Sequence, residues 1–391
     1  MPLWKLKREF TRLCHQILAL PQSLLMLPMR LSEPRRRRMH DLAFPNNLHL
    51  TEGKVALGKR LVIIVLFQPR GVSPSTIETC QDFVSAGYTP LVISNAVLSA
   101  VDQALLAETC WRVVDRPNFG YDFGAYRDGL RMIRETDITP DRLILMNDSF
   151  WCKITPMLLG RMEGLNVDLA GLLQDEKVLH DTQGGTPTRK MHIESYCLVI
   201  SKKLWKTKVF QDFWDGYQLT DIKPKTIKNG EIGFSRTMSA AGFSLGALTS
   251  RSLFLAGLSN AKNDVIQQAL RYAAYDDPVF KSEGVALFSR LAIGEEWRND
   301  ALDHIRRWVN RRRFNAAFPL ASAHLFDASF LKKNQEKIYA AARETYLRGC
   351  EDGLIEPTSS AIITEIAESL GRTSPAAIFA NSAAKYGSDK E

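Results

Sequence analysis

Apolar and polar positions follow a regular series over the first two-thirds of the chain. Residues 61–67 form a continuous run of apolar, mostly β-branched side chains, the pattern of a strand that is buried on both faces. Further apolar runs lie at 90–94, 111–115, 142–147, 169–173 and 196–200. Helical spacing separates the first four runs, so the pattern predicts successive strand–helix steps and an open, largely parallel sheet. Such α/β sheets bind ligands beyond the carboxyl ends of their strands.

The pattern changes near residue 256, beyond which only helical spacing continues. Helices are predicted at 264–274, 282–291, 299–314, 332–348 and 360–370. We therefore expect three parts. These are a basic amphipathic N-terminal segment with a linker (1–45), an α/β domain (46–255) and a helical C-terminal region (256–391).

The distribution of charge and of cysteines argues against nucleic-acid binding and against a structural zinc site. Of the formal net charge of +8, residues 1–40 carry +7, as nine Lys and Arg against two Glu. Because this surplus is confined to one end and no recognition motif accompanies it, nucleic-acid binding is not expected. The six cysteines are far apart, without a Cys-x-x-Cys pair or a histidine at zinc-ligand spacing, so a structural zinc is not expected either. Free thiols indicate a reducing, cytoplasmic compartment.

The basic N-terminal segment has two interpretations. Apolar positions 3, 6, 10, 13, 17 and 20 share one helical face, and Arg35 to Arg38 follow. A basic amphipathic helix with a polybasic run suits the inner face of an anionic membrane, where the protein would be peripheral. The alternative is a helix that packs on the protein's own body, followed by a solvated arginine linker. Co-sedimentation with anionic vesicles distinguishes the two.

A carboxylate follows the apolar run at 142–147, at the predicted ligand-binding edge of the sheet. The run ends in Asn147-Asp148-Ser149. Asp148 is a candidate ligand for Mg²⁺ or Mn²⁺, hard ions that take one or two carboxylates together with phosphate oxygens. Asn147 is a candidate donor-binding residue beside it. The alternative is that Asp148 only caps the following turn, because Asn, Asp and Ser all favour turns.

A glycine-rich loop follows the run at 111–115. It contains Asn118, Gly120 and Asp122 at alternate positions and leads into a predicted helix. Gly120 permits close approach of the backbone to a ligand, and the positive end of the helix points at the loop. Asn118 and Asp122 are then candidates to bind the base or ribose of a nucleotide. The alternative is a glycine-rich helix start with Asp122 as its N-cap.

Glu231 is the candidate general base. A carboxylate on the acceptor side can deprotonate an attacking hydroxyl, and partial burial is expected to raise its pKa toward the working range. The alternative is an ordinary glutamate in the first turn of a helix. His192 and Glu194 form a further candidate pair, although a single histidine before a strand is usually structural.

The order of these motifs resembles the rhamnan synthesis F family of bacterial polysaccharide and lipopolysaccharide assembly proteins. The likeness covers roughly residues 60–250: an Asn-x-Gly-x-Asp-x-Gly-Ala-Tyr loop, a strand ending in Asn-Asp-Ser and a His-x-x-Ser-Tyr strand. That family is similar to inverting glycosyltransferases of the A-type fold, in which a strand-end Asp-x-Asp binds the metal and the donor diphosphate. The resemblance places Asp148 at the metal position and Glu231 at the base position, with Arg236 and Gly242 behind it. Asp148 is a single carboxylate where that class usually has two.

The resemblance implies transfer of a sugar, with inversion, from a nucleoside-diphosphate donor to a saccharide or lipid-linked acceptor. Mg²⁺ or Mn²⁺ would neutralise the departing diphosphate, and Glu231 would take the acceptor proton. Two alternatives stay open. A sugar-phosphate transferase would leave a phosphodiester in its product, and a non-catalytic scaffold of a polysaccharide assembly complex would not bind nucleotides.

Overall fold

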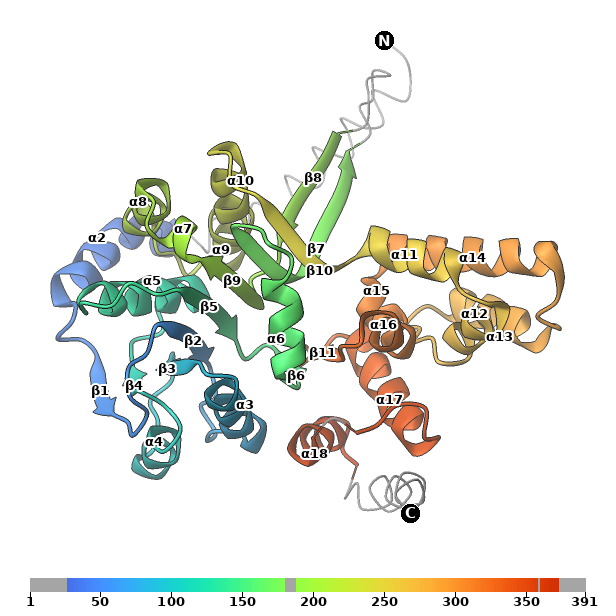
Figure 1. Ribbon diagram of the computed structural model, residues 1–391, viewed down its shortest axis with the longest axis horizontal. Coiled ribbons are helices and arrows are strands. Elements are labelled where there is room, and N and C mark those ends of the chain that lie inside the picture. Colours follow the sequence, from blue (N-terminus) through green and yellow to red (C-terminus); the bar gives the residue numbers. More distant parts are fainter. Residues whose placement is uncertain (1–26, 180–187, 358, 373–391) are drawn as a thin grey trace, which may run out of the picture.

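A computed structural model describes residues 27–179, 188–357 and 359–372, so the predicted amphipathic helix over residues 3–20 lies outside the described residues. Within these ranges nine strands form one sheet, in the order β1-β4-β3-β2-β5-β9-β7-β10 with β8 beside β7 (Figure 1). The strands are β1 (His49–Glu52), β2 (Arg60–Leu66), β3 (Thr89–Ser94), β4 (Arg112–Asp115), β5 (Arg142–Asn147), β7 (Leu169–Leu179), β8 (Thr188–Ile193), β9 (Cys197–Ser201) and β10 (Leu245–Ser250).

Most strands of this sheet run in the same direction. β2 pairs in parallel with β3 and β5, β3 with β4, and β7 with β10. β9 lies antiparallel between β5 and β7, so β7 again runs in the direction of β5. The carboxyl ends of these parallel strands therefore meet at one edge of the sheet. This confirms the predicted α/β fold with a mostly parallel sheet.

Helices cover both faces of the sheet. Side chains of β2 alternate between the faces: Val62 and Ile64 lie in one apolar core, and Leu61 and Ile63 in another. The first core includes α3 (Pro74–Ser85), α4 (Ala100–Ala107) and α6 (Pro156–Glu163). The second includes α5 (Tyr121–Arg134), α7 (Lys202–Trp205), α8 (Lys208–Gly216) and α10 (Ile232–Ala240). Between α8 and α10 lie α9 (Lys223–Thr226) and the π-helical turn η1 (Ile227–Glu231).

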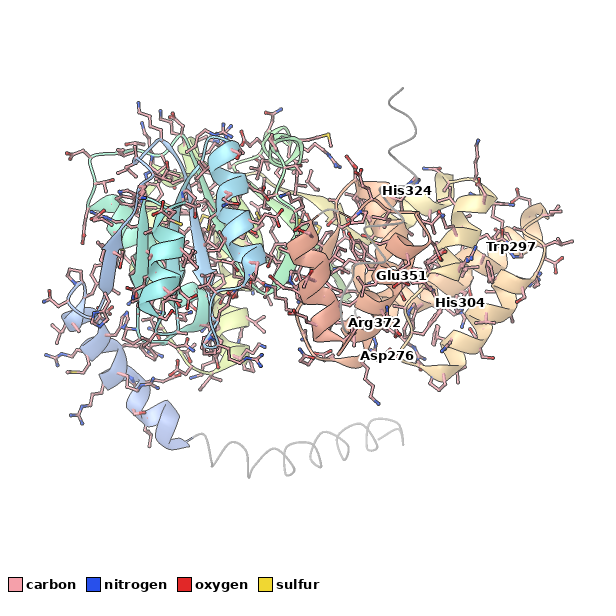
Figure 2. All side chains as sticks on the ribbon, turned by 90° about the horizontal axis from the view of Figure 1, so that it is seen from below. Asp276, Trp297, His304, His324, Glu351 and Arg372 are labelled. Atoms are coloured by element: carbon pink, nitrogen blue, oxygen red, sulfur yellow. The ribbon has the colours of Figure 1, made fainter. Side chains whose placement is uncertain are left out.

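The C-terminal region forms a helical body beside the sheet (Figure 1). Its core is continuous with the first core of the α/β part, because Phe254, Trp308 and Tyr346 belong to the same cluster as Val62. His304, labelled in Figure 2, is buried in this body and contacts Tyr275 at 2.9 Å. The helices are α11 (Arg251–Asn260), α12 (Asn263–Arg271), α13 (Pro278–Ser289), α14 (Gly294–Arg311), α15 (Phe314–Ala317), α16 (Pro319–Phe326), α17 (Lys337–Glu351) and α18 (Ser360–Ser369).

One predicted helix begins later than the sequence pattern indicates. The spacing predicts a helix over 332–348, whereas α17 begins at Lys337. Phe330–Lys332 instead form β11, which pairs antiparallel with β6 (Phe150–Cys152) at the centre of the molecule (Figure 1). A tertiary partner thus overrides the local helical pattern.

The arginine run of 35–38 lies in helix α2 (Leu27–Ala43), which packs on the α/β part. Arg36 pairs with Asp221 at 2.5 Å, and Arg37 Nε donates to the Leu219 carbonyl at 2.6 Å. Part of the predicted polybasic linker is therefore a docked helix. No helix in the described ranges is both long and apolar enough to cross a membrane.

Candidate active site

Three predicted site residues meet at the carboxyl edge of the sheet. Asp122 lies in the first turn of α5, Asn147 ends β5, and Glu231 lies where η1 passes into α10. Asn147 Nδ2 donates to Asp122 Oδ2 at 3.0 Å. The Ser195 hydroxyl joins this pair to Glu231, because its Oγ lies 2.8 Å from Glu231 Oε2 and 3.5 Å from Asp122 Oδ2. Together with His192, these residues are called the carboxylate cluster below.

Glu231 is held by donors at both carboxylate oxygens. The Ser195 N–H and hydroxyl each donate to Oε2 at 2.8 Å, and His192 Nε2 lies 3.3 Å from Oε1. Burial raises the pKa of Glu231, but the hydrogen bonds from His192 and Ser195 outweigh it and hold the pKa below its usual range. The pKa increase expected from partial burial is therefore wrong, because these donors stabilise the charged form. Glu231 is ionised at neutral pH and can accept a proton.

An irregular helix places Glu231 in the cluster. The π-helical turn η1 interrupts the helical path between α9 and α10, a feature that is frequent at functional sites. Gly230 packs directly on Phe123: a Cβ at this position would lie 2.7 Å from the ring. Ser235 Oγ accepts a hydrogen bond from the Ile193 N–H at 3.0 Å and fixes α10 against the end of β8. The glycine and the serine thus bring Glu231 close to Asp122 and Ser195.

Asp122 is the carboxylate whose pKa moves toward neutrality. Burial, and then the negative charge of Glu231, raise the pKa of Asp122 to about 6 against the opposing hydrogen bonds from Phe123 and Asn147. Two neighbouring carboxylates with pKa values displaced in opposite directions are a common feature of acid–base sites. The sequence assigned Asp122 to ligand binding, and its pKa did not follow from the local motif.

We predict that Asp122→Asn stabilises the protein at neutral pH. The raised pKa means that the folded state binds a proton more tightly than the unfolded state, so stability falls as pH rises from about 4 to about 6. Asparagine removes this cost, and the free energy of unfolding should increase by about 1–2 kcal/mol at neutral pH. Urea unfolding of both proteins at about pH 4 and about pH 7.5 measures the effect, which should nearly vanish at the lower pH. An equal difference at both pH values would contradict the prediction.

Asp148 follows Asn147, but its hydrogen bonds are to the segment after β2 and not to the carboxylate cluster. Its Oδ2 accepts hydrogen bonds from the Phe67 N–H at 3.1 Å and from Gln68 Nε2 at 3.0 Å, so it ties the end of β5 to the segment after β2. Mg²⁺ can be held by one carboxylate together with phosphate oxygens and waters. Across the described ranges, no group of three or more His, Cys, Asp or Glu side chains could hold a metal ion. Asp148 therefore fits a divalent ion only with a phosphate supplying much of the coordination.

The structure does not bring Asn118 and Gly120 into the cluster. Asn118 is exposed in the loop between β4 and α5. Gly120 has a φ of 87°, its N–H donates to Asp221 Oδ1 at 3.2 Å, and a Cβ there would lie 2.8 Å from Leu219 Cδ2. The close approach at Gly120 is therefore to the protein's own chain.

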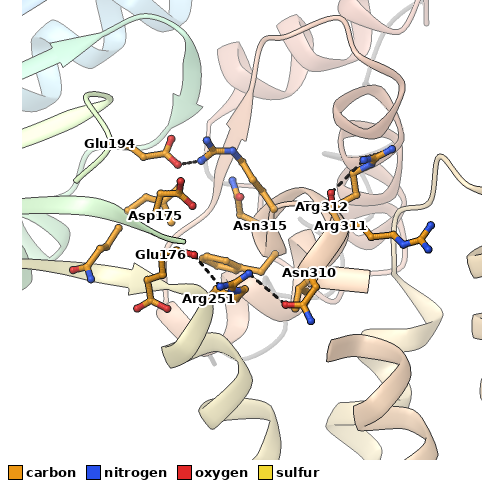
Figure 3. A pocket seen from close by; sticks show the side chains of 13 residues that line it. Asp175, Glu176, Glu194, Arg251, Asn310, Arg311, Arg312 and Asn315 are labelled. Atoms are coloured by element: carbon orange, nitrogen blue, oxygen red, sulfur yellow. Dashed lines mark hydrogen bonds and ion pairs between the residues drawn. The ribbon is translucent and has the colours of Figure 1, made fainter. Parts of the chain in front are cut away.

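A cavity of about 310 Å³ lies between the middle of β7 and the helical region (Figure 3). Asp175 and Glu194 line it from the sheet side, and Glu194 forms an ion pair with Arg313 across it. Asn315 is only 4% exposed, and its Oδ1 has no hydrogen-bond partner within the described part of the chain. Glu194 directly precedes Ser195, so the cavity adjoins the carboxylate cluster. Its mixture of charged and amide groups suits a polar ligand.

Ser195 is the residue of this site to which sequence reasoning gave no role. It lies in the His-x-x-Ser-Tyr stretch that contributes to the family resemblance. Nothing local distinguishes it, because its function in the cluster depends on Glu231 from a distant helix. The only sequence feature that pointed to Ser195 was its place in the His-x-x-Ser-Tyr stretch.

Known proteins resemble the chain over the segments that build the carboxylate cluster. Residues 91–279 match the model of the rhamnan synthesis protein F family. This match confirms the resemblance predicted from the motif order, and it includes Asp122, Asn147, Ser195 and Glu231.

Relatives extend the resemblance beyond the matched segment. The protein y4gN of Sinorhizobium fredii is 26% identical over 351 residues, which cover 88% of this chain and 87% of y4gN. The virulence protein VirA of Vibrio anguillarum is 27% identical over 176 residues, which cover 44% of this chain and half of VirA. Among solved structures, the glycosyltransferase GlyE of Streptococcus pneumoniae is 14% identical, with a TM-score of 0.28 over 65% of this chain and 64% of GlyE.

The rhamnan synthesis F match ends within the helical region, at the start of α13. The matched segment contains the cavity-lining residues of the sheet, such as Asp175 and Glu194. It does not contain residues 309–315, which line the cavity from the helical region. The residues that complete the cavity, and those of β11, therefore lie outside the segment that the family model covers.

Proposed function

We propose that the chain is a glycosyltransferase that moves a sugar from a nucleoside-diphosphate donor to a saccharide or lipid-linked acceptor in bacterial cell-surface polysaccharide or lipopolysaccharide synthesis. The observation that carries this proposal is the bonded arrangement of Asp122, Asn147, Ser195 and Glu231. It lies at the carboxyl edge of a mostly parallel sheet, where α/β folds bind their ligands, and within the segment that matches the rhamnan synthesis protein F model.

Glu231 is the general base in this proposal. Its ionised carboxylate accepts the proton of the acceptor hydroxyl while that oxygen bonds to the anomeric carbon of the donor sugar. The bond from the anomeric carbon to the diphosphate breaks at the same time, and the nucleoside diphosphate leaves as an anion. Attack from the face opposite the leaving group inverts the anomeric centre. Ser195 and His192 orient the carboxylate throughout.

Asp122 and Asn147 are assigned to the donor, with the exposed Asn118 and the Gly120 loop at the nucleoside end. Asp148 would hold Mg²⁺ or Mn²⁺, which would supply positive charge to the diphosphate when bound. Asp148 also accepts hydrogen bonds from Phe67 and Gln68, so it fixes the segment after β2 beside the end of β5.

We also propose that residues 1–45 attach the protein to the inner face of an anionic membrane. Arg35 and Arg38 support this, because both are exposed on α2 while Arg36 and Arg37 bind the protein itself. Association with anionic but not neutral vesicles in a co-sedimentation assay tests it, and equal association with both would contradict it.

A donor panel tests the proposed transferase activity. UDP-, dTDP- and GDP-linked sugars would be screened by thermal unfolding with Mn²⁺ and with EDTA, and positive donors then incubated with saccharide acceptors for mass spectrometry. A donor present at about 100 times its dissociation constant should stabilise the fold by about 2.7 kcal/mol, which is readily measured. The expected product carries one added sugar and no phosphodiester. If no sugar nucleotide stabilises the protein and no product forms, the proposal is wrong.

A further inference from the structure

Two lysines from the C-terminal region reach the candidate active site through β11. In the pairing of β11 with β6, Lys332 lies opposite Phe150. The next residue, Lys333, donates its backbone N–H to the Ser149 carbonyl at 3.0 Å. Ser149 directly follows Asp148. A segment from the far end of the chain is therefore fixed beside the end of β5.

Neither ammonium group forms a direct ion pair in the part of the chain that the structure describes. Lys332 Nζ lies 4.4 Å from the centre of the Tyr196 ring, and Lys333 Nζ lies 5.2 Å from that of Trp151. Both lysines are partly buried, yet neither Nζ forms an ion pair or a hydrogen bond within the described residues. Cation–π contacts hold the two charges in place without neutralising them.

A third cation supports the same strand. Arg343 is 1% exposed, and its Nη1 donates to the carbonyls of Lys332 and Asn334, both at 2.8 Å. Its Nε and Nη2 have no hydrogen-bond partner in the part of the chain that the structure describes. Removing cations from water without a counter-charge is costly. Among the described residues, Lys332, Lys333 and Arg343 therefore have no ion-pair partner.

Both lysines interact electrostatically with carboxylates of the candidate site. Burial lowers the pKa of Lys332 to about 7, and Arg313 adds to this effect, while Glu231 acts in the opposite direction. Burial also lowers the pKa of Lys333, and Asp148 opposes it. The backbone hydrogen bond from Lys333 to Ser149, the residue after Asp148, fixes Lys333 beside the strand end to which the ligand is assigned. The contact of Lys332 with Tyr196, the residue after Ser195, places Lys332 beside the carboxylate cluster.

We propose that Lys332 and Lys333 bind the diphosphate of the donor directly, with Arg343 holding β11 in position. This inference rests on the proposed function, because that function names a nucleoside diphosphate as the ligand. Lysines bind phosphate groups as point charges. Two of them beside Asp148 supply positive charge at a strand end that offers a metal only one carboxylate. The helical region thereby completes the donor site.

Inorganic pyrophosphate is the probe that tests this site without requiring transfer. Calorimetric titration in EDTA would compare the full chain with the double variant Lys332→Gln and Lys333→Gln. Loss of both charges should weaken pyrophosphate binding at least about tenfold. The double Lys→Arg variant should retain most of the affinity, because it keeps both charges. Lys281→Gln, on an exposed turn of α13, is the matched control and should bind as the unaltered protein does.

The outcomes separate this proposal from the proposed function. Binding that depends on the two lysines supports the site even if no sugar transfer is found. Equal binding by the double glutamine variant, or no binding by the unaltered chain in EDTA, overturns it even if transfer is found. Circular dichroism and thermal unfolding check that the variants fold. A double arginine variant that fails to bind although folded also counts against a site based on charge.

Discussion

Glu231→Gln should lower kcat for sugar transfer by about 10²- to 10⁴-fold, the range expected when a general base is removed. Glutamine has the shape of glutamate, and its amide oxygen can still accept from Ser195, so the fold and the cluster geometry should persist. What is lost is the ability to take the acceptor proton. Single-turnover kinetics measure the chemical step directly.

The control for this variant is Glu108→Gln, at the exposed end of α4, where Glu108 only pairs with Lys54. It should leave kcat unchanged. The Glu231→Gln protein should still bind the donor, because its pyrophosphate-binding groups are intact. A rate close to that of the unaltered protein would remove Glu231 from the base position.

The pH profile adds an independent test of the same assignment. His192 and Ser195 hold the pKa of Glu231 below its usual range. Protonation of Glu231 should therefore lower the rate only well below neutral pH. Asp122, with a pKa of about 6, would instead produce a loss of rate between about pH 5 and 7 if its ionised form were required. The position of the acid limb therefore distinguishes the two carboxylates.

Asp128→Ala should cost about 3–5 kcal/mol of stability, the range for breaking a buried ion pair by removing one partner. Arg116 Nε donates to Asp128 Oδ2 at 2.8 Å, with both side chains at most 1% exposed, and His40 Nε2 lies 3.0 Å from the same oxygen. Removing the carboxylate leaves the Arg116 guanidinium buried without an anion. Arg116 also donates to the Phe119 carbonyl at 2.8 Å, so the loop before α5 should loosen as well.

Urea unfolding at neutral pH measures this loss, with Asp212→Ala as the control. Asp212 forms an exposed pair with Lys208 on α8, so its removal should change stability by less than about 0.5 kcal/mol. Burial raises the pKa of Asp128, but His40 and Arg116 outweigh burial and hold the pKa below its usual range. The stabilisation is therefore present above about pH 4 and is lost as pH falls below it. Similar unfolding energies for Asp128→Ala and Asp212→Ala would show that the buried network contributes little.

Asp128 illustrates what the sequence could not show. It lies within the glycine-rich loop and helix that the sequence singled out, yet nothing distinguished it from a solvated helix residue. Its partners are fixed by tertiary structure, since His40 comes from α2 and Arg116 from the end of β4. The same holds for Ser195, whose role depends on Glu231 from another helix.

The sequence by itself predicted the strands β2, β3, β4, β5, β7 and β9 and the helices α3, α4 and α5, because the side-chain period of each element is a local property. It did not predict the strands β1, β6, β8, β10 and β11. It also placed Asp122 and Asn147 near one edge, because the carboxyl ends of parallel strands converge there. The family resemblance, rather than a strand end, assigned Glu231 to the base position. Only the tertiary structure decided which groups touch. Hydrogen bonds from Ser195 and His192 decided that the pKa of Glu231 is lowered. Pairing with β6 decided that β11 stands where the start of a helix was predicted. These outcomes depend on contacts between residues far apart in the chain, which a pattern of neighbouring residues does not record.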